Sequence, residues 1–178
     1  MAQSQLFEND PIRRHATFSD DRVFRYTLMR TWGAESKCCF VMLNPSIADA
    51  SIDDPTIRRC MGFAKAWGHG GLIVVNLFAF RSTDPQVMIA EHKKGGDIIG
   101  PANDLNIIMS CKTAARVVAA WGAHGSLAQR SAHVRKMLGE RDIKVECLGL
   151  TKLNEPQHPL YIEGDRPLQP LPDLAPTT

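Results

Sequence analysis

The feature of this sequence that most constrains its fold is a repeated alternation between short apolar runs and amphipathic segments. The apolar runs have the length and composition of strands that are buried on both faces. Strands that are joined by helical crossovers favour an α/β fold, here a three-layer sandwich around a mainly parallel, four-stranded central sheet. The four predicted strands are residues 38–43, 72–77, 116–121 and 143–148.

The helix signal is clearest after residue 53. Asp54 is a typical N-cap residue, and Pro55 is favoured at the first helical position. The apolar residues that follow are spaced by three or four, so they share one helical face. These residues are Ile57, Cys60, Met61, Ala64 and Trp67.

Three further helices are predicted between the later strands. A short one covers 85–91, and a stronger one begins after Pro101. The next covers 126–138. In the second of these helices we expect one apolar face that consists of Leu105, Ile108 and Met109.

Length and composition predict one compact domain. The chain has 178 residues, of which 44% are hydrophobic, and this is enough for a single core. We expect an N-terminal extension over 1–21, one α/β domain over 22–165, and a proline-rich tail over 166–178 that is extended or disordered. Within the domain, residues 23–28 alternate imperfectly, which indicates an edge strand or a hairpin.

The overall charge and the cysteines exclude several classes of protein. The formal net charge is +2, which does not indicate a nucleic-acid-binding protein but leaves room for a local basic patch. No apolar run approaches the roughly 18–20 residues of a membrane span, and the N-terminus lacks the apolar core of a signal peptide. We therefore expect a cytoplasmic protein without a membrane partner, whose five cysteines are reduced, buried thiols.

Motifs for metals, nucleotides and common nucleophiles do not occur. The sequence contains no C-x-x-C pair, no H-E-x-x-H motif and no H-x-E…C-x-x-C motif, so zinc sites are disfavoured. It also contains no G-x-G-x-x-G loop, Walker loop or G-x-S-x-G elbow, so dinucleotide, nucleotide-triphosphate and serine-hydrolase sites have no support. No metal and no cofactor is expected.

Ligands of parallel α/β sheets bind beyond the carboxyl ends of the strands, so the residues that follow each strand form the candidate site. The first strand is followed by Asn44, Pro45 and Ser46. The Asn44 amide offers both a donor and an acceptor, and Pro45 stiffens its backbone. Asn44 either orients a water molecule or binds the polar edge of a heterocycle, or it belongs to a plain Asn-Pro turn.

The second and third strands contribute four more candidates. Asn76 lies within an apolar strand, where it needs hydrogen-bond partners or bridges strand ends. Phe78 provides a stacking surface for a planar ligand or packs in the core. Trp121 and His124 follow the third strand beside two glycines, which permit close backbone approach to a ligand.

The fourth strand is followed by a polar loop that contains Lys152 and His158. His158 precedes a proline, and a rigidly held histidine can donate a hydrogen bond to a developing anion. Asn44 and His158 lie in two loops that we expect to converge at the same edge of the sheet.

Five segments of the chain resemble the DUF1643 family of bacterial proteins. They are FVMLNPSIADASIDDPTIRRC, WGHGGLIVVNLFAFRSTDP, GPAND, VVAAWGAHG and LGLTKLNEPQHPLY, which together span roughly residues 25–161. This resemblance implies a family but no activity.

A second, more distant resemblance is to the uracil-DNA glycosylase superfamily. VMLNPS is similar to the first motif of that superfamily, WGAHG to its W-G-x-x-A region, and HPLY to its H-P-S-P motif. The resemblance implies the glycosylase fold, with Asn44 orienting the attacking water and His158 stabilising negative charge on the departing base. The glycine that closes the first motif and the serine-proline pair that helps to bind phosphate are both replaced in this sequence.

Three hypotheses follow. The first is a pocket that binds a nucleobase, with Pro45, Ser46 and the other candidates around it, and that hydrolyses an N-glycosidic bond in damaged or single-stranded DNA. The second is an enzyme or binding protein for a free nucleotide or another small anionic metabolite. The third is a non-catalytic interaction module that uses the proline-rich tail.

Overall fold

The computed structural model describes residues 12–46 and 51–172. Its elements in chain order are β1 (Arg13–Phe18), β2 (Arg25–Thr31), β3 (Lys37–Met42), α1 (Pro55–Ala66), β4 (Gly71–Asn76), α2 (Pro85–Lys93), α3 (Asn103–Thr113), β5 (Arg116–Ala119), η1 (Ala123–Gln129), α4 (Arg130–Gly139), β6 (Glu146–Cys147), η2 (Pro159–Tyr161) and β7 (Gln169–Pro170).

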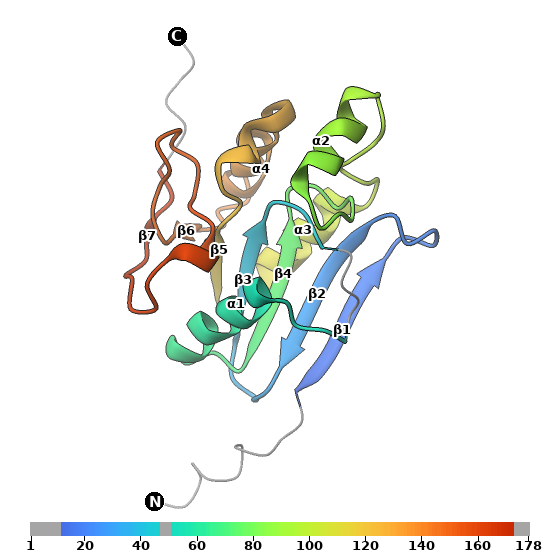
Figure 1. The fold of residues 1–178 in the computed structure, drawn as a ribbon. Coiled ribbons are helices and arrows are strands. Elements are labelled where there is room, and N and C mark those ends of the chain that lie inside the picture. Colours follow the sequence, from blue (N-terminus) through green and yellow to red (C-terminus); the bar gives the residue numbers. More distant parts are fainter. Residues whose placement is uncertain (1–11, 47–50, 173–178) are drawn as a thin grey trace, which may run out of the picture.

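These elements form one mixed sheet with helices on both faces (Figure 1). The seven strands lie in the order β1-β2-β4-β3-β5-β6-β7. The inner strands β4, β3, β5 and β6 are parallel, and they correspond to the four strands predicted from the sequence. The predicted α/β class is confirmed, whereas the four-stranded, mainly parallel sheet is corrected to a seven-stranded mixed sheet.

The additional strands lie at the two edges of the sheet, where the sequence signal for strands is weakest. β1 and β2 form an antiparallel hairpin that joins β4, and β7 pairs antiparallel with β6. Edge strands bury little apolar surface, so their sequences lack the continuous apolar runs of central strands. β1 and β7 lie outside the range 22–165, so the sheet uses residues from both flanking segments. Leu171 N donates to Val145 O at 2.9 Å and extends the pairing of the tail.

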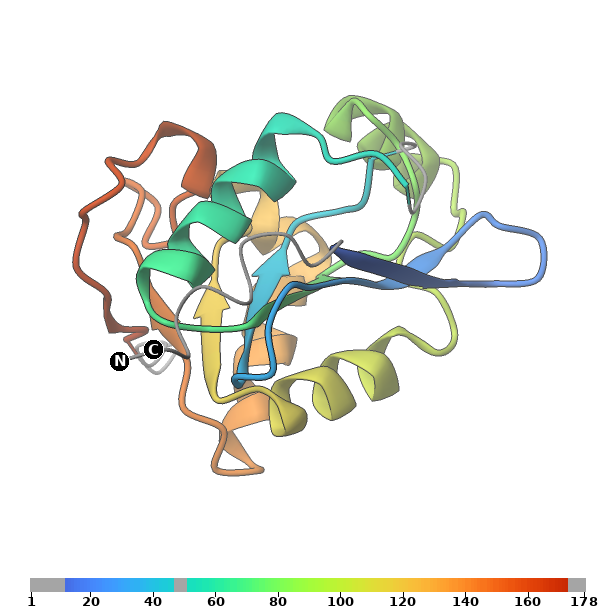
Figure 2. The ribbon, with the colours of Figure 1, turned by 90° about the horizontal axis from the view of Figure 1, so that it is seen from below.

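Two apolar clusters fill the space between the sheet and its helices. The sheet face that includes Phe40, Val74 and Val118 packs against α1. The opposite face, which includes Val41 and Val75, packs against α3 and α4, and Figure 2 shows α1 and these two helices on opposite sides of the sheet. All five cysteines are buried, and none forms a disulfide.

Helix α1 confirms the clearest helix prediction. The Asp54 side chain accepts a hydrogen bond from Ile57 N at 2.8 Å, which is the predicted N-cap interaction. Four of the five predicted face residues are buried, and Trp67, the fifth, is half-buried at the C-cap. Among the described residues, no helix is long and apolar enough to cross a membrane.

The predicted face of α3 was wrong for two of its three residues, while Ile108 is half-buried and packs against the core. Leu105 and Met109 are 63% and 54% exposed, and the helix buries Ile107 and Cys111 instead. The cause is Asn103, which is fully buried and donates to the backbone oxygens of Asn76 and Leu77 at 3.0 Å. This polar anchor fixes the rotation of the helix, so hydrophobic spacing alone does not reveal the buried side.

The predicted helix over 126–138 is divided into η1 and α4. Ala128 and Gln129 both have positive φ angles, 51° and 55°, which end the first helix and redirect the chain. Gly125 allows this arrangement because a Cβ atom there would lie 2.1 Å from Trp121 Cδ1. The helix break is therefore imposed by close packing against the indole ring.

Candidate functional site

The order of the parallel strands places the candidate site at one edge of the sheet. After β3 the chain crosses to β4 on one side, and it later crosses to β5 on the other side of β3. The crevice between β3 and β5 is the topological switch point, where ligands of open α/β sheets bind beyond the carboxyl ends of the strands. Residues 44–46 and 121–124 lie there, together with the loop that leads to η2.

Asn44 is held firmly at the end of β3. Its Nδ2 donates to Ser82 O at 2.9 Å, to Ser82 Oγ at 3.1 Å and to Pro45 O at 3.3 Å. Pro45 O also accepts from Ser82 N at 2.9 Å, so the β3 end is joined to the loop after β4. No described residue donates to Asn44 Oδ1, which makes this oxygen the acceptor that the site can offer to a ligand.

Ser46 connects the β3 end to the start of α1. Its Oγ donates to Asp54 Oδ2 at 3.2 Å, while Asp54 Oδ1 caps the helix. One carboxylate therefore orients both the hydroxyl of Ser46 and the first turn of α1. Pro45 is buried and Ser46 is half-buried.

His158 lies beside the carboxyl end of β5. A Cβ atom at Gly122 would be 3.8 Å from His158 Cβ, and Gly122 N donates to Pro156 O at 2.8 Å. His158 Nδ1 accepts from Leu160 N at 3.3 Å, so the proton of the neutral imidazole resides on Nε2. Burial lowers the pKa of His158, and the nearby Asp54 charge partly opposes this shift.

A β-bulge brings a buried arginine to the same region. Thr17 pairs with Thr27 and Phe18 with Arg25, so Tyr26 is the extra residue of β2. Tyr26 lies near Gly100, where a Cβ atom would be 3.2 Å from Tyr26 Cε1. Arg25 interacts electrostatically with Asp54, and burial is the main cause that lowers its pKa to about 10.

Asp54 is thus the common neighbour of the candidate site. Its carboxylate accepts from Ser46, and its charge acts on both His158 and Arg25. From the predicted set, the structure therefore brings Ser46 and His158 to Asp54, while the amide of Asn44, two residues before Ser46, is bonded to Ser82. Arg25 was not selected from the sequence, because an arginine at the start of an edge strand is normally solvated.

Trp121 belongs to a buried hydrogen-bond network behind this site. Its Nε1 donates to Glu155 Oε2 at 2.6 Å, and Ser131 Oγ donates to Glu155 Oε1 at 2.7 Å. Arg135 Nη2 adds a contact of 3.2 Å to Glu155 Oε2. Glu155, which is 5% exposed, therefore fixes the loop that carries His158. Sequence analysis missed Glu155, whose only signal is an acidic residue between Asn and Pro in a polar loop.

Two of the remaining predicted residues adjoin the carboxyl end of β3, where Asn76 pairs with Met42 and Phe78 N donates to Leu43 O at 3.0 Å. Asn76 and Phe78 are buried, and Phe78 is part of the apolar cluster on the α3 face. Asn76 Nδ2 is buried and has no hydrogen-bond partner among residues 12–46 and 51–172. His124 and Lys152 are exposed on η1 and on the loop after β6. Their part in binding a ligand stays a prediction.

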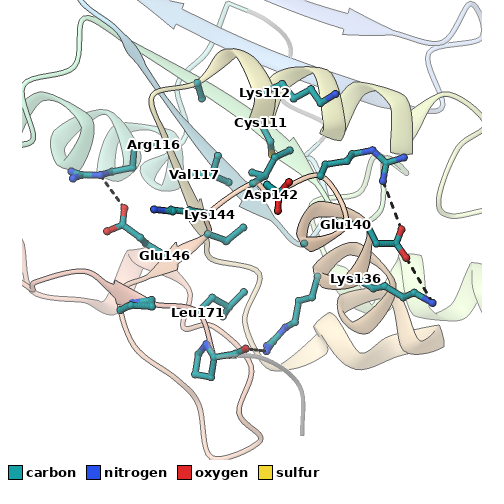
Figure 3. A pocket seen from close by; sticks show the side chains of 18 of the residues that line it. Cys111, Lys112, Arg116, Val117, Lys136, Glu140, Asp142, Lys144, Glu146 and Leu171 are labelled. Atoms are coloured by element: carbon teal, nitrogen blue, oxygen red, sulfur yellow. Dashed lines mark hydrogen bonds and ion pairs between the residues drawn. The ribbon is translucent and has the colours of Figure 1, made fainter. Parts of the chain in front are cut away.

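A large cavity lies at the opposite edge of the sheet, near the amino ends of β5 and β6 (Figure 3). Its volume is about 1110 Å³. None of the predicted site residues lines it. Within the described part of the chain, no group of three or more His, Cys, Asp or Glu side chains is placed to hold a metal ion.

Comparison with known proteins gives one match. A family model described as "Protein of unknown function (DUF1643)" matches residues 25–160, which is most of the chain. No curated protein and no solved structure matches. These comparisons do not support the predicted resemblance to uracil-DNA glycosylases, which rests on the sequence motifs alone.

Proposed function

We propose that this chain, which belongs to the DUF1643 family, binds a nucleobase at the carboxyl ends of β3 and β5 and hydrolyses its N-glycosidic bond. The observation that carries the proposal is that Ser46, two residues after Asn44, donates to Asp54, and that the charge of Asp54 acts on His158, which lies 114 residues after Asn44 in the chain.

Asn44 is the residue that orients the attacking water in this proposal. Three hydrogen bonds from Nδ2 fix the amide plane, and the Oδ1 acceptor points away from this donor group on the same planar amide. A fixed acceptor is what a water molecule needs in order to keep one lone pair directed at a reacting carbon. Water would attack C1′ of the sugar while the C1′–N bond breaks and its electron pair leaves with the base.

His158 stabilises the negative charge that forms on the departing base. Its neutral form donates from Nε2, since Nδ1 is occupied by Leu160 N. The lowered pKa of His158 keeps the ring neutral at physiological pH, so it acts as a hydrogen-bond donor and not as a proton source. The departing base then takes its proton from solvent or from the attacking water.

A free nucleotide or another small anionic metabolite is the second candidate. The buried Arg25 guanidinium favours it, because the pKa of about 10 leaves a positive charge beside Asp54 at neutral pH. Arginine binds phosphate and carboxylate oxygens through paired N–H groups. The net charge of only +2 also gives little of the long-range attraction that a DNA-binding enzyme uses.

Base release separates the catalytic proposal from its alternatives. The purified protein is incubated with oligonucleotides that contain uracil, hypoxanthine or a mismatch, and with the matching nucleoside 5′-monophosphates, and free base is quantified. We expect release by the wild type and a loss of at least about 100-fold in Asn44→Ala and His158→Ala. Asn106→Ala and His15→Ala are the matched controls, because these side chains lie on α3 and β1.

The outcomes are distinct. Release that survives both Asn44→Ala and His158→Ala, or no release from any substrate, refutes the hydrolase. Release from nucleotides alone, together with no salt-dependent shift of DNA in electrophoresis, establishes the second candidate.

A further inference from the structure

The cavity at the amino ends of β5 and β6 has no role in the proposed hydrolysis. It is lined by residues 111–112 and 114–117 from α3 to β5, by residues 132, 135–136 and 139–146 from α4 to β6, and by residues 170–172 of the tail. Parallel strands place their amino and carboxyl ends at opposite edges of the sheet. A ligand here would therefore be separated from the candidate site by the length of the strands.

Apolar side chains form part of the middle of this cavity. Cys111 and Val117 line it from α3 and β5, and Val145 and Leu171 line it from the β6 side. Figure 3 shows Cys111, Val117 and Leu171 with charged side chains on both sides of them, and with Asp142 also in the middle of the view. An apolar floor of this kind stabilises a bound hydrocarbon surface, at about 25 cal/mol for each Å² removed from water.

The walls of the cavity carry an excess of positive charge. Three acidic side chains line it, Glu140, Asp142 and Glu146. Six basic side chains line it: Lys112, Arg116, Arg135, Lys136, Arg141 and Lys144. Arg135 is paired with Glu155, which lies outside the lining, so the remaining excess of two equals the net charge of +2 of the whole chain.

Both glutamates that line the cavity already form ion pairs with arginine or lysine side chains. Arg116 Nε lies 3.1 Å from Glu146 Oε2 on one side. On the other side Glu140 lies 3.9 Å from Lys136 Nζ and 3.9 Å from Arg141 Nη1. Lys112 and Lys144 form no ion pair with any described residue, so these two ammonium groups are the cations that can receive an anion.

One wall is rigid. The Arg135 side chain is 9% exposed and donates to Asn154 O at 3.0 Å, Glu155 Oε2 at 3.2 Å and Pro172 O at 3.2 Å. These bonds join α4 to the loop after β6 and to the tail. A cavity whose wall is fixed before binding loses little conformational entropy when a ligand enters.

We propose that this cavity is a second binding site, which takes an organic anion with an apolar, ring-sized body and one or two phosphate, sulfonate or carboxylate groups. The apolar middle receives the body, and Lys112 and Lys144 receive the charge. A bare inorganic anion would leave the apolar floor unused, and a neutral hydrophobic molecule would leave the two ammonium groups without a partner. The volume of about 1110 Å³ slightly exceeds the range of roughly 300–1,000 Å³ for small-molecule sites.

The test uses a matched pair of fluorescent probes on the full chain. 8-Anilinonaphthalene-1-sulfonate carries a sulfonate on an apolar body, and N-phenyl-1-naphthylamine has the same body without the charge. We expect saturable binding of the sulfonate at one site, at least about tenfold tighter than binding of the uncharged probe, as expected for one charged hydrogen bond. Added NaCl should reduce this preference. Equal affinities for the two probes, or no saturable binding, would overturn the proposal.

Charge reversal locates the site. Lys112→Glu combined with Lys144→Glu should weaken sulfonate binding at least about tenfold and leave the uncharged probe unaffected. The control is Lys93→Glu combined with Lys94→Glu, which places the same charge change on exposed residues at the end of α2. Equal affinity in both double variants would overturn the assignment, and the probe pair on wild-type protein decides the question if the first variant does not fold.

Discussion

Replacing Glu155 with leucine should cause one of the largest losses of stability available to a single substitution in this chain. The Glu155 carboxylate accepts hydrogen bonds from Trp121, Ser131 and Arg135 at 2.6, 2.7 and 3.2 Å. Leucine keeps the apolar volume but leaves the Arg135 guanidinium, which is 9% exposed, without its carboxylate. Breaking a buried ion pair from one side costs about 3–5 kcal/mol.

The other two donors add to this loss, but not in full. Trp121 and Ser131 each lose an acceptor in a buried position, and a single unsatisfied buried group costs about 1–3 kcal/mol. Because the three donors share one carboxylate, their losses are not additive. We therefore expect about 4–5 kcal/mol for Glu155→Leu, and about 1–3 kcal/mol for Glu155→Gln, which retains one acceptor oxygen.

Urea unfolding, followed by tryptophan fluorescence and far-UV circular dichroism, measures the difference. The midpoint should fall while the slope of unfolding free energy against urea stays constant. Glu140→Leu is the control, since Glu140 is exposed and its ion pairs of 3.9 Å should contribute less than about 0.5 kcal/mol. A loss below about 1 kcal/mol in Glu155→Leu would refute the view that Glu155 anchors the loop of His158.

Three further substitutions or conditions test other parts of the structure. Gly125→Ala should lower the free energy of unfolding by at least about 2 kcal/mol, because the new Cβ atom would lie 2.1 Å from Trp121 Cδ1. The control is Gly139→Ala, whose Cβ atom would meet nothing within 4 Å and which should be neutral or stabilising in the same urea assay. Asp54→Ala should remove the N-cap of α1 at a cost of about 1 kcal/mol. It should also lower the pKa of His158 further, because the negative charge of Asp54 raises that pKa in the wild type. An unchanged titration of His158 in NMR would contradict this. Burial lowers the pKa of His158 below 6.5 in the folded protein, so the unfolded chain binds more protons than the folded one as the pH falls through 6.5. The free energy of unfolding should therefore decrease between pH 7 and pH 5, and it should decrease less in His158→Gln. An equal decrease in both proteins would contradict the assignment.

The central strands and α1 could be predicted from the sequence because their physical signals are local. The sequences of β3 and β4 are continuous apolar runs. Each of these strands has a neighbouring strand on both sides in the sheet. Asp54 and Pro55 mark the start of α1 at the residue where the structure begins it. The switch point then follows from strand order, whereas the convergence of Asn44 and His158 on one ligand stays a prediction.

What the sequence did not reveal depends on contacts between distant residues. Asn103 sets the rotation of α3 through bonds to the β4 end, and no spacing rule contains that contact. Arg25 reaches the site only because of a bulge at Tyr26. Glu155 is buried because Trp121, Ser131 and Arg135 surround it, and in the sequence it is simply an acidic loop residue.

The central claim, that a nucleobase binds at the carboxyl ends of β3 and β5, is tested most directly by an NMR titration of isotope-labelled protein. Uracil, hypoxanthine and their nucleosides are added stepwise, and backbone amide shifts are followed. The account predicts saturable shifts for Ser46, Gly122 and His158 with at least one base, and their loss in Asn44→Ala. Shifts confined to the cavity between α3 and α4, or no saturable shift with any of these ligands, would contradict it.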